Sequence, residues 1–181
     1  MEQGVFPGEI IPAPEVSEEA INSYRLLSAD IASGVAVVST RLRGRDYAAT
    51  VSGFLSVSYD PPTLLVSLYA ESRIAEAVVE SGTWALSLLS ARQRGTANWL
   101  ASPGSPLEGL LSQVDYGRGP VTEAAVIEGC IAWFEVRTTS VTTAATHQLV
   151  VGEVVAMGRR ASAEDEADPL VHFASAYARL K

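Results

Sequence analysis

Apolar positions near the start of the chain recur with the period of a helix. Ser17 precedes two glutamates, which is typical of a helix start because the hydroxyl can cap free amides and the acids suit the positive end of the helix dipole. Apolar side chains then follow at helical spacing, at Ile21, Tyr24, Leu27 and Ile31. We therefore predict one helix here, closed by Gly34.

From residue 35 onward the pattern changes to that of strands. The β-branched run at 35–40 and the run at 46–51 flank a turn at Gly44, which predicts a hairpin. The segment TLLVSLY at 63–69 follows the break at Pro61-Pro62 and predicts a largely buried strand. Further β-rich segments lie at 84–89, 126–140 and 147–157, the last two joined by a Thr- and Ala-rich loop at 142–146.

Helices interrupt the strands at two places. Ser72 can cap a helix over 73–80 that ends at Gly82, and the pattern of 91–101 is helical although it contains a glycine. The closing segment, 169–180, fits either a helix or a short strand followed by a helix. Because strands dominate without regular βαβ alternation, the pattern favours a mainly β fold with flanking helices, built as an antiparallel barrel.

Composition sets the domain count and excludes several classes of partner. The 181 residues are 48% hydrophobic and 19% charged, which suits one domain at 17–181 after an extended, Pro-containing leader at 1–16 that lacks the features of a secretory signal. The formal net charge of −8 disfavours nucleic acid and anionic membranes, so a phosphorylated ligand needs a local cationic site. Cys130 is the single cysteine, so no disulfide forms within the chain, and we expect a cytoplasmic protein.

The chain lacks the common catalytic motifs. It contains no GxSxG, HExxH, P-loop or GxGxxG sequence. With two histidines and one cysteine, it also lacks the ligands for a multi-histidine or cysteine-based metal site. Side chains alone therefore offer little chemistry, and a bound cofactor would supply it.

Three segments have the composition of a cofactor site. Residues 50–58 are rich in hydroxyls around Gly53, which suits the polar edge of a flat cofactor; the alternative is a polar strand edge and loop. Ser72 and Arg73 at a helix N-terminus suit a phosphate, or form an ordinary cap beside a solvated arginine. His147 opens a strand, where it could position a hydride donor or lie on a rim.

Several motifs follow one another in a specific order. They are SGVAVVST at 33–40, ATVSGFLSVSYDPPTLLVSL at 49–68, ESR at 71–73, SGTWALSLLS at 81–90, HQLVVGEV at 147–154 and PLVHFASAYARL at 169–180. In these motifs and their order the chain resembles the flavin reductase-like, FMN-binding split-barrel family, which includes the reductase components of two-component flavin monooxygenases. The resemblance runs from about Tyr24 to Leu180.

The resemblance implies a flavin site assembled from distant parts of the chain. The implied roles fall into three groups: contact with the flavin ring and ribityl chain, binding of its phosphate, and placement of a nicotinamide. The flavin contacts would be Thr50, Val51, Ser52, Ser56, Ser67, Leu68, Trp99 and Tyr177, the phosphate contacts Ser72 and Arg73, and the catalytic histidine His147.

One motif departs from the family pattern. Where the family usually has Gly-Asp-His, this chain has Ala145-Thr146-His147. The histidine remains, but alanine tolerates a positive φ poorly, and the lost carboxylate could have oriented the imidazole. The departure therefore bears on nicotinamide use more than on flavin binding.

The resemblance implies an NAD(P)H-dependent flavin reductase that supplies reduced flavin to a partner monooxygenase. FMN or FAD would be the flavin and NADH or NADPH the co-substrate, in a homodimer that binds neither nucleic acid nor membrane. Two alternatives remain open. One is an FMN-binding protein of the same fold without efficient NAD(P)H turnover, which the altered turn favours. The other is a flavin-dependent oxidase of a small substrate.

Overall fold

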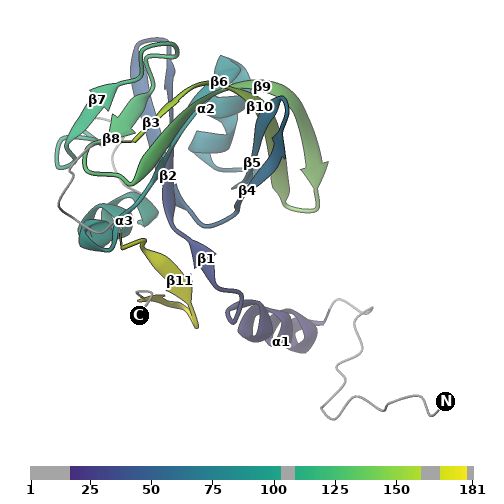
Figure 1. The fold of residues 1–181 in the computed structure, drawn as a ribbon. Helices are drawn as coiled ribbons and strands as arrows, with labels where there is room; N and C mark the ends of the chain where they lie inside the picture. Colours follow the sequence, from purple (N-terminus) through teal and green to yellow (C-terminus); the bar gives the residue numbers. More distant parts are fainter. Residues whose placement is uncertain (1–16, 103–108, 160–167, 179–181) are drawn as a thin grey trace.

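The computed structural model describes residues 17–102, 109–159 and 168–178 (Figure 1). In these ranges the chain is mainly β, with helices α1 (Glu18–Ser28), α2 (Arg73–Ser81) and α3 (Arg94–Ala101) and a 3-10 turn at Ala91–Gln93. The strands are β1 (Ser33–Gly34), β2 (Ala36–Leu42), β3 (Arg45–Val51), β4 (Phe54–Tyr59), β5 (Pro62–Tyr69), β6 (Thr83–Leu88), β7 (Tyr116–Arg118), β8 (Ala125–Ile127), β9 (Ala132–Ala144), β10 (His147–Gly158), β11 (Val171–Phe173) and β12 (Ala176–Ala178).

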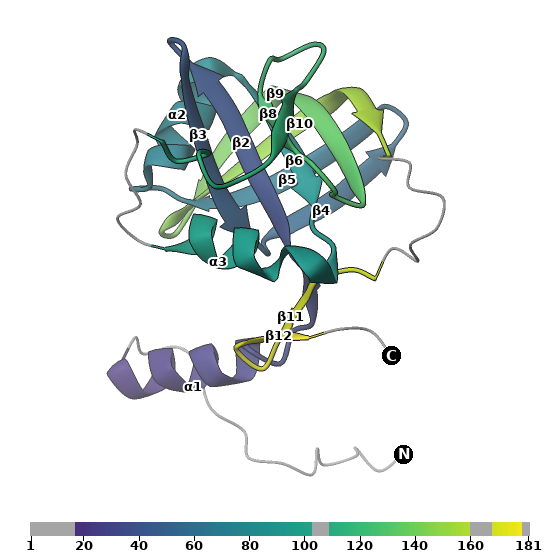
Figure 2. The ribbon, with the colours of Figure 1, turned by 90° about the vertical axis from the view of Figure 1, so that its left-hand side faces the viewer.

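Seven strands form one sheet in the order β3-β2-β6-β9-β10-β5-β4, with every neighbouring pair antiparallel. β3 and β4 are its edge strands, yet only Ser52 and Gly53 separate them in the chain. The two edges must therefore approach each other at this point, and the sheet curls round on itself (Figure 2). There the Ser67 amide of β5 donates a 2.8 Å hydrogen bond to the Gly53 carbonyl.

Two hydrophobic cores share strand β2. The first core joins α2 to the sheet and includes Val38 of β2 with Ile74 and Val78 of α2. The second lies beside α3 and includes Val37 of β2 with Leu100. Because successive side chains of a strand point to opposite faces, the β-branched run of β2 supplies both cores at once.

The predicted α2 is confirmed, and both of its ends follow local rules. The Ser72 hydroxyl accepts a 3.3 Å hydrogen bond from the Ala75 amide, and Gly82 closes the helix with a left-handed φ of 67°. The predicted first helix is confirmed but ends earlier, at Ser28, and the β2–β3 hairpin is confirmed. The serine hydroxyls at the two helix starts accept hydrogen bonds from amides that have no partner within the helix, and the left-handed glycine ends α2.

Three segments differ from their predicted structure. Residues 50–58, which could also have been a polar strand edge and loop, form the end of β3, a short turn and most of strand β4, which pairs with β5. The loop at 142–146 is a tight turn at Ala145 and Thr146, because β9 extends to Ala144. In the described part of the closing segment the predicted short strand is present as β11, but it continues into β12 to form a hairpin instead of a helix, since β11 pairs with β1.

Helix α1 stands apart from the main sheet. It lies beside the small sheet formed by β1, β11 and β12 (Figures 1 and 2), and none of its residues is buried. Its apolar residues are exposed, with Tyr24 at 73% and Leu27 at 60%. The predicted leader at 1–16 lies outside the described residues. Across the described ranges, no helix combines the length and apolar character needed to cross a membrane.

Candidate functional site

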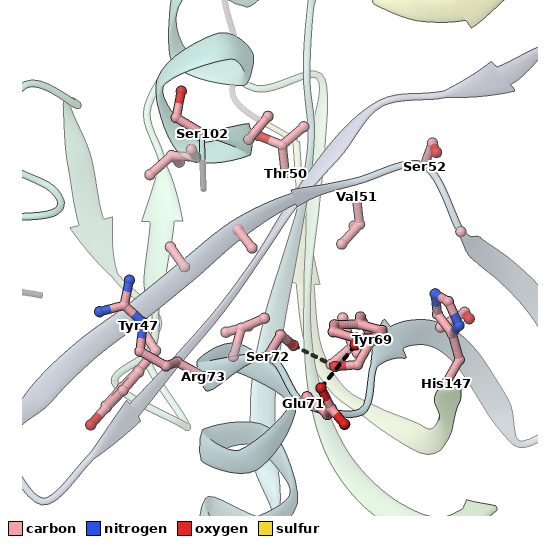
Figure 3. Close-up of a pocket in the computed structure, with 18 of the residues that line it drawn as sticks. Tyr47, Thr50, Val51, Ser52, Tyr69, Glu71, Ser72, Arg73, Ser102 and His147 are labelled. Atoms are coloured by element: carbon pink, nitrogen blue, oxygen red, sulfur yellow. Dashed lines mark hydrogen bonds between the residues drawn. The ribbon is translucent and has the colours of Figure 1, made fainter. Parts of the chain in front are cut away.

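A cleft of about 790 Å³ lies along the outer edge of β3 (Figure 3). Its walls come from the N-terminus of α2, the C-terminal end of α3, the end of β5 and the start of β10. This volume is within the range of small-molecule sites, roughly 300–1,000 Å³. Eight of the predicted site residues line it: Thr50, Val51, Ser52, Ser67, Leu68, Ser72, Arg73 and His147.

The α2 end of the cleft is suited to an anion. Arg73 is the first residue of α2, its side chain is exposed, and Figure 3 shows it with Tyr47 at the end of the cleft away from His147. The Ser72 hydroxyl donates to the Tyr69 carbonyl at 2.6 Å, so its hydrogen is already used in fixing the cap. The first-turn amides, the positive end of the helix dipole and the Arg73 guanidinium are therefore the groups that would attract a phosphate.

The middle of the cleft is an open strand edge. Among the described strands β3 pairs only with β2, so the backbone groups along its other edge border the cleft at residues 47–51. The Thr50 hydroxyl donates to the Ala97 carbonyl at 2.8 Å, which ties β3 to α3 and leaves its oxygen lone pairs as acceptors. A Cβ added at Gly53 would lie 3.2 Å from Ser67 Cβ, so a glycine lets the chain pass close to β5. This edge offers a flat ligand backbone donors and acceptors.

The other end of the cleft is aromatic and carries His147. His147 lies opposite Tyr69 in the β10–β5 pair, and their rings meet edge to face with centroids 5.9 Å apart. The Thr146 hydroxyl lies 3.0 Å from His147 Nδ1. Ala145 adopts a positive φ of 51°, so the turn forms without glycine. The imidazole is therefore held at the mouth of the cleft by a neighbouring hydroxyl instead of a carboxylate.

Tyr69 links the two ends of the cleft. Its hydroxyl donates a 2.9 Å hydrogen bond to a Glu71 carboxylate oxygen. That hydrogen bond, together with the negative charge of Glu71, raises the pKa of Tyr69 above its ordinary value. Tyr69 therefore stays a neutral donor at physiological pH, with its ring beside His147 and its backbone carbonyl receiving the Ser72 hydroxyl.

Three predicted residues lie outside the cleft. The Trp99 indole donates to the Leu110 carbonyl at 2.8 Å and packs against the second core. Tyr177 packs against the same core, 5.8 Å from the Arg94 guanidinium, and its burial raises its pKa. Ser56 is exposed on the edge strand β4. The fold does not bring these three residues to the cleft within this protomer.

Sequence reasoning missed four polar or aromatic side chains of the cleft. They are Tyr47, Tyr69, Glu71 and Ser102. Tyr69 and Glu71 both come just before the predicted Ser72-Arg73 pair, so their closeness to the helix start was a usable signal. Tyr47 and Ser102 reach the cleft through the packing of β3 and α3, which local sequence does not encode.

The arrangement can hold a flat ligand with an anionic tail and present one of its faces to a second molecule. The anion-attracting groups and the histidine lie at opposite ends of one cleft, joined by a strand edge that offers backbone hydrogen bonds. No cluster of acidic, histidine or cysteine side chains suited to a metal is found among residues 17–102, 109–159 and 168–178.

Comparison with known proteins gives consistent results. The family model described as "Flavin reductase like domain" matches residues 28–181. The reductase component of 4-hydroxyphenylacetate 3-monooxygenase from Thermus thermophilus is 29% identical over 87% of this chain and 95% of its own. A flavin reductase (NADH) from Kitasatospora aureofaciens is 32% identical over 81% of this chain and 75% of its own.

A solved structure shows the same fold. The crystal structure of BorF, the flavin reductase component of a bacterial two-component tryptophan halogenase, superposes with a TM-score of 0.81 at 28% identity. The match covers 88% of this chain and 98% of that one.

Proposed function

Because the chain belongs to the flavin reductase-like family, we propose that it is an NAD(P)H-dependent flavin reductase in which the cleft along β3 binds FMN or FAD. One observation carries this proposal: a single cleft joins an anion-attracting helix N-terminus to His147 across an open strand edge. That order of groups matches the phosphate, ribityl chain and ring of a flavin.

The residues of the cleft fit a flavin. Arg73 and the first-turn amides of α2 would hold the phosphate. This local positive site would offset the repulsion of an anionic ligand by a protein of net charge −8. Thr50, Val51 and Ser52 would meet the polar ring edge through the open edge of β3, and Ser67 and Leu68 would line the ring from β5. When bound, the flavin supplies the chemistry by accepting a hydride from the nicotinamide.

The side chains of the protein would contribute by positioning the nicotinamide against the flavin. His147 and Tyr69 stand at the mouth of the cleft, where they would orient a nicotinamide against the exposed side of the ring. The Thr146 hydroxyl at 3.0 Å from Nδ1 fixes the imidazole, leaving Nε2 to face the incoming molecule. Because Ala145 keeps the turn despite its positive φ, this geometry supports the reductase over a flavin-binding protein without turnover.

We propose that the curled sheet is the split barrel of this family and that the chain forms a homodimer, for which the exposed helix α1 is the support. An isolated helix of 11 residues is marginal in water, yet α1 has no buried residue and exposes Tyr24 and Leu27. A second copy of the chain would cover this face. Light scattering should report a dimer for the wild type and a smaller species for Leu27→Glu.

A monooxygenase partner in the cytoplasm completes the proposal. The named relatives include the reductase component of a monooxygenase. Reduced flavin made in an open cleft is free to leave for such a partner. The buried single thiol, Cys130, is consistent with a reducing compartment.

Steady-state assays test the proposed activity. Purified protein should oxidise NADH or NADPH only when FMN or FAD is added, at a rate well above the background without protein. Flavin binding without NAD(P)H oxidation would favour the binding protein, and oxidation of a small organic substrate without nicotinamide would favour the oxidase.

A further inference from the structure

We propose that a second hollow beside the cleft binds the adenylyl half of FAD, which makes FAD the preferred flavin of this chain. The proposal rests on the proposed function and specifies its substrate. The hollow has a volume of about 430 Å³. Its lining residues are Arg45, Asp46, Gly109, Leu110, Leu111, Ser112 and Tyr116.

The two hollows are neighbours along one strand. Residues 45 and 46 of β3 line the second hollow, and residues 47–51 of the same strand line the cleft. Leu110 lines both. Figure 3 shows Arg73 and Tyr47 at the end of the cleft away from His147, which is the end that β3 continues toward Arg45. A ligand whose phosphate lies at Arg73 therefore has its next group directed to the second hollow.

The chemistry of the hollow suits a purine nucleotide. Tyr116 is half-buried, and its ring is held by the Arg118 guanidinium 5.1 Å from the ring centroid. Arg118 is itself fixed by a 2.8 Å bond to Asp46. An aromatic ring can stack a base on the face that the guanidinium does not cover. Leu110 and Leu111 add apolar surface to the hollow, and the Ser112 hydroxyl can donate to or accept from a ribose or a base edge.

The charges also suit a diphosphate. The Asp46 carboxylate is the acidic group that lines the hollow, and it forms an ion pair with Arg118. Its negative charge is therefore balanced and does not repel a phosphate nearby. Arg45 is exposed at the start of β3, two residues from Tyr47 and on the same face of the strand. Arg73 lines the cleft and Arg45 lines the hollow, so a pyrophosphate that passes from one to the other would have a guanidinium in each.

Both FAD and NADH carry an adenylyl group, and the position of the hollow favours FAD. The hollow adjoins the Arg73 end of the cleft, whereas the nicotinamide is placed at the His147 end. The adenylyl group of a flavin dinucleotide extends directly from the phosphate at Arg73.

Calorimetric titration of the full chain with FAD and with FMN tests the proposal. The wild type should bind FAD at least about fivefold more tightly than FMN, the lower bound for stacking one base on an aromatic ring. Ser112→Trp fills the hollow at an exposed position and should remove this preference while leaving the dissociation constant for FMN unchanged. Arg45→Glu should weaken FAD in the same selective way, and it supplies a second variant if the tryptophan disturbs folding.

The control is Arg137→Glu, an identical charge change at an exposed position of β9 that lines neither hollow. It should leave both affinities unchanged. Equal affinities of the wild type for FAD and FMN would overturn the proposal while leaving the reductase activity intact. A rise in KM for NADH in Ser112→Trp, measured with FMN as the flavin, would assign the hollow to the nicotinamide dinucleotide and overturn it as well. Failure of the wild type to bind either flavin would overturn the proposed function itself.

Discussion

The two ends of the cleft are built in different ways. At the α2 end, Ser72 is held by two hydrogen bonds and the following residues, Ile74 and Ala75, are buried in the first core. At the β9–β10 turn, His147 is exposed and is held by a neighbouring hydroxyl and an edge contact with Tyr69. We therefore expect flavin binding to depend on the core-packed helix start, called here the rigid end, and hydride transfer to depend on the exposed turn, called here the adjustable end.

The largest effect is expected at the adjustable end. His147→Ala should lower NAD(P)H turnover by about 10²-fold, the cost of misplacing a reacting group, because the nicotinamide loses its positioning side chain. Flavin affinity, which depends on the α2 end, should stay the same. Steady-state kinetics and flavin titration measure both quantities.

His172→Ala is the matched control for this prediction. His172 lies in β11 beside Tyr177 and does not line the cleft. Its removal should leave turnover unchanged. Unchanged turnover in His147→Ala would contradict the proposed role of His147 in positioning the nicotinamide.

At the rigid end we expect a loss of flavin affinity instead of a loss of turnover. Arg73→Ala should weaken FMN by roughly 1–3 kcal/mol, the usual value of a charge-assisted contact, while riboflavin, which has no phosphate, binds as before. Fluorescence titration with both ligands measures the difference. Equal weakening of FMN and riboflavin would contradict the assignment of the phosphate to this end of the cleft.

A third prediction concerns the backbone of the turn. Ala145→Gly should raise the free energy of unfolding by about 1 kcal/mol or less, because glycine accepts the left-handed φ of 51° without the clash of a Cβ, although it is more flexible when unfolded. Denaturant unfolding measures this change. Ala144→Gly, one residue earlier in β9, should instead destabilise the protein, since glycine weakens a strand. A loss of stability in both variants would contradict the strain assigned to Ala145.

The smallest effect is a shift in one titration. Tyr69 ionises above its ordinary value of 10.0 because its hydroxyl donates to Glu71 and the carboxylate charge opposes the phenolate. Since the folded pKa is raised, this contact stabilises the fold below pH 10 and is lost as the pH rises through the folded pKa. Glu71→Gln keeps an acceptor but removes the charge, so it should lower the pKa of Tyr69 partly, and Glu71→Ala should lower it further.

Difference absorbance against Tyr69→Phe isolates this titration from those of the other tyrosines. Tyr177, whose pKa is raised by burial, should titrate alike in every variant. An unchanged Tyr69 titration in Glu71→Ala would show that Glu71 does not control the aromatic end of the cleft.

The rigid end could be predicted from the sequence because its rules are local. A serine cap, a following arginine and a left-handed glycine nine residues later are enough to place α2 and its N-terminus. The β2–β3 hairpin was predictable in the same way, from the β-branched run at 35–40 and the run at 46–51 on either side of the turn at Gly44.

The rest of the site depends on distant contacts. The pairing of Tyr69 with His147 follows from the register between β5 and β10, which are far apart in the chain. Trp99 lies in the second core because Leu110 accepts its indole hydrogen bond, so an aromatic match to the family did not place it in the cleft. The strand β4 was missed because its hydroxyl-rich sequence resembles a loop until pairing with β5 is known.

The most direct test of this account is anaerobic reduction of flavin by a single addition of NADH or NADPH, followed by stopped-flow absorbance. Wild type, Arg73→Ala and His147→Ala are each compared at saturating flavin. We expect fast loss of flavin absorbance in the wild type and in Arg73→Ala, because saturating flavin compensates for the weaker binding of this variant. In His147→Ala we expect slow loss, because saturating flavin does not restore the position of the nicotinamide. Slow reduction in all three proteins would contradict the division of the cleft into a binding end and a transfer end, and absence of reduction in the wild type would contradict the reductase itself.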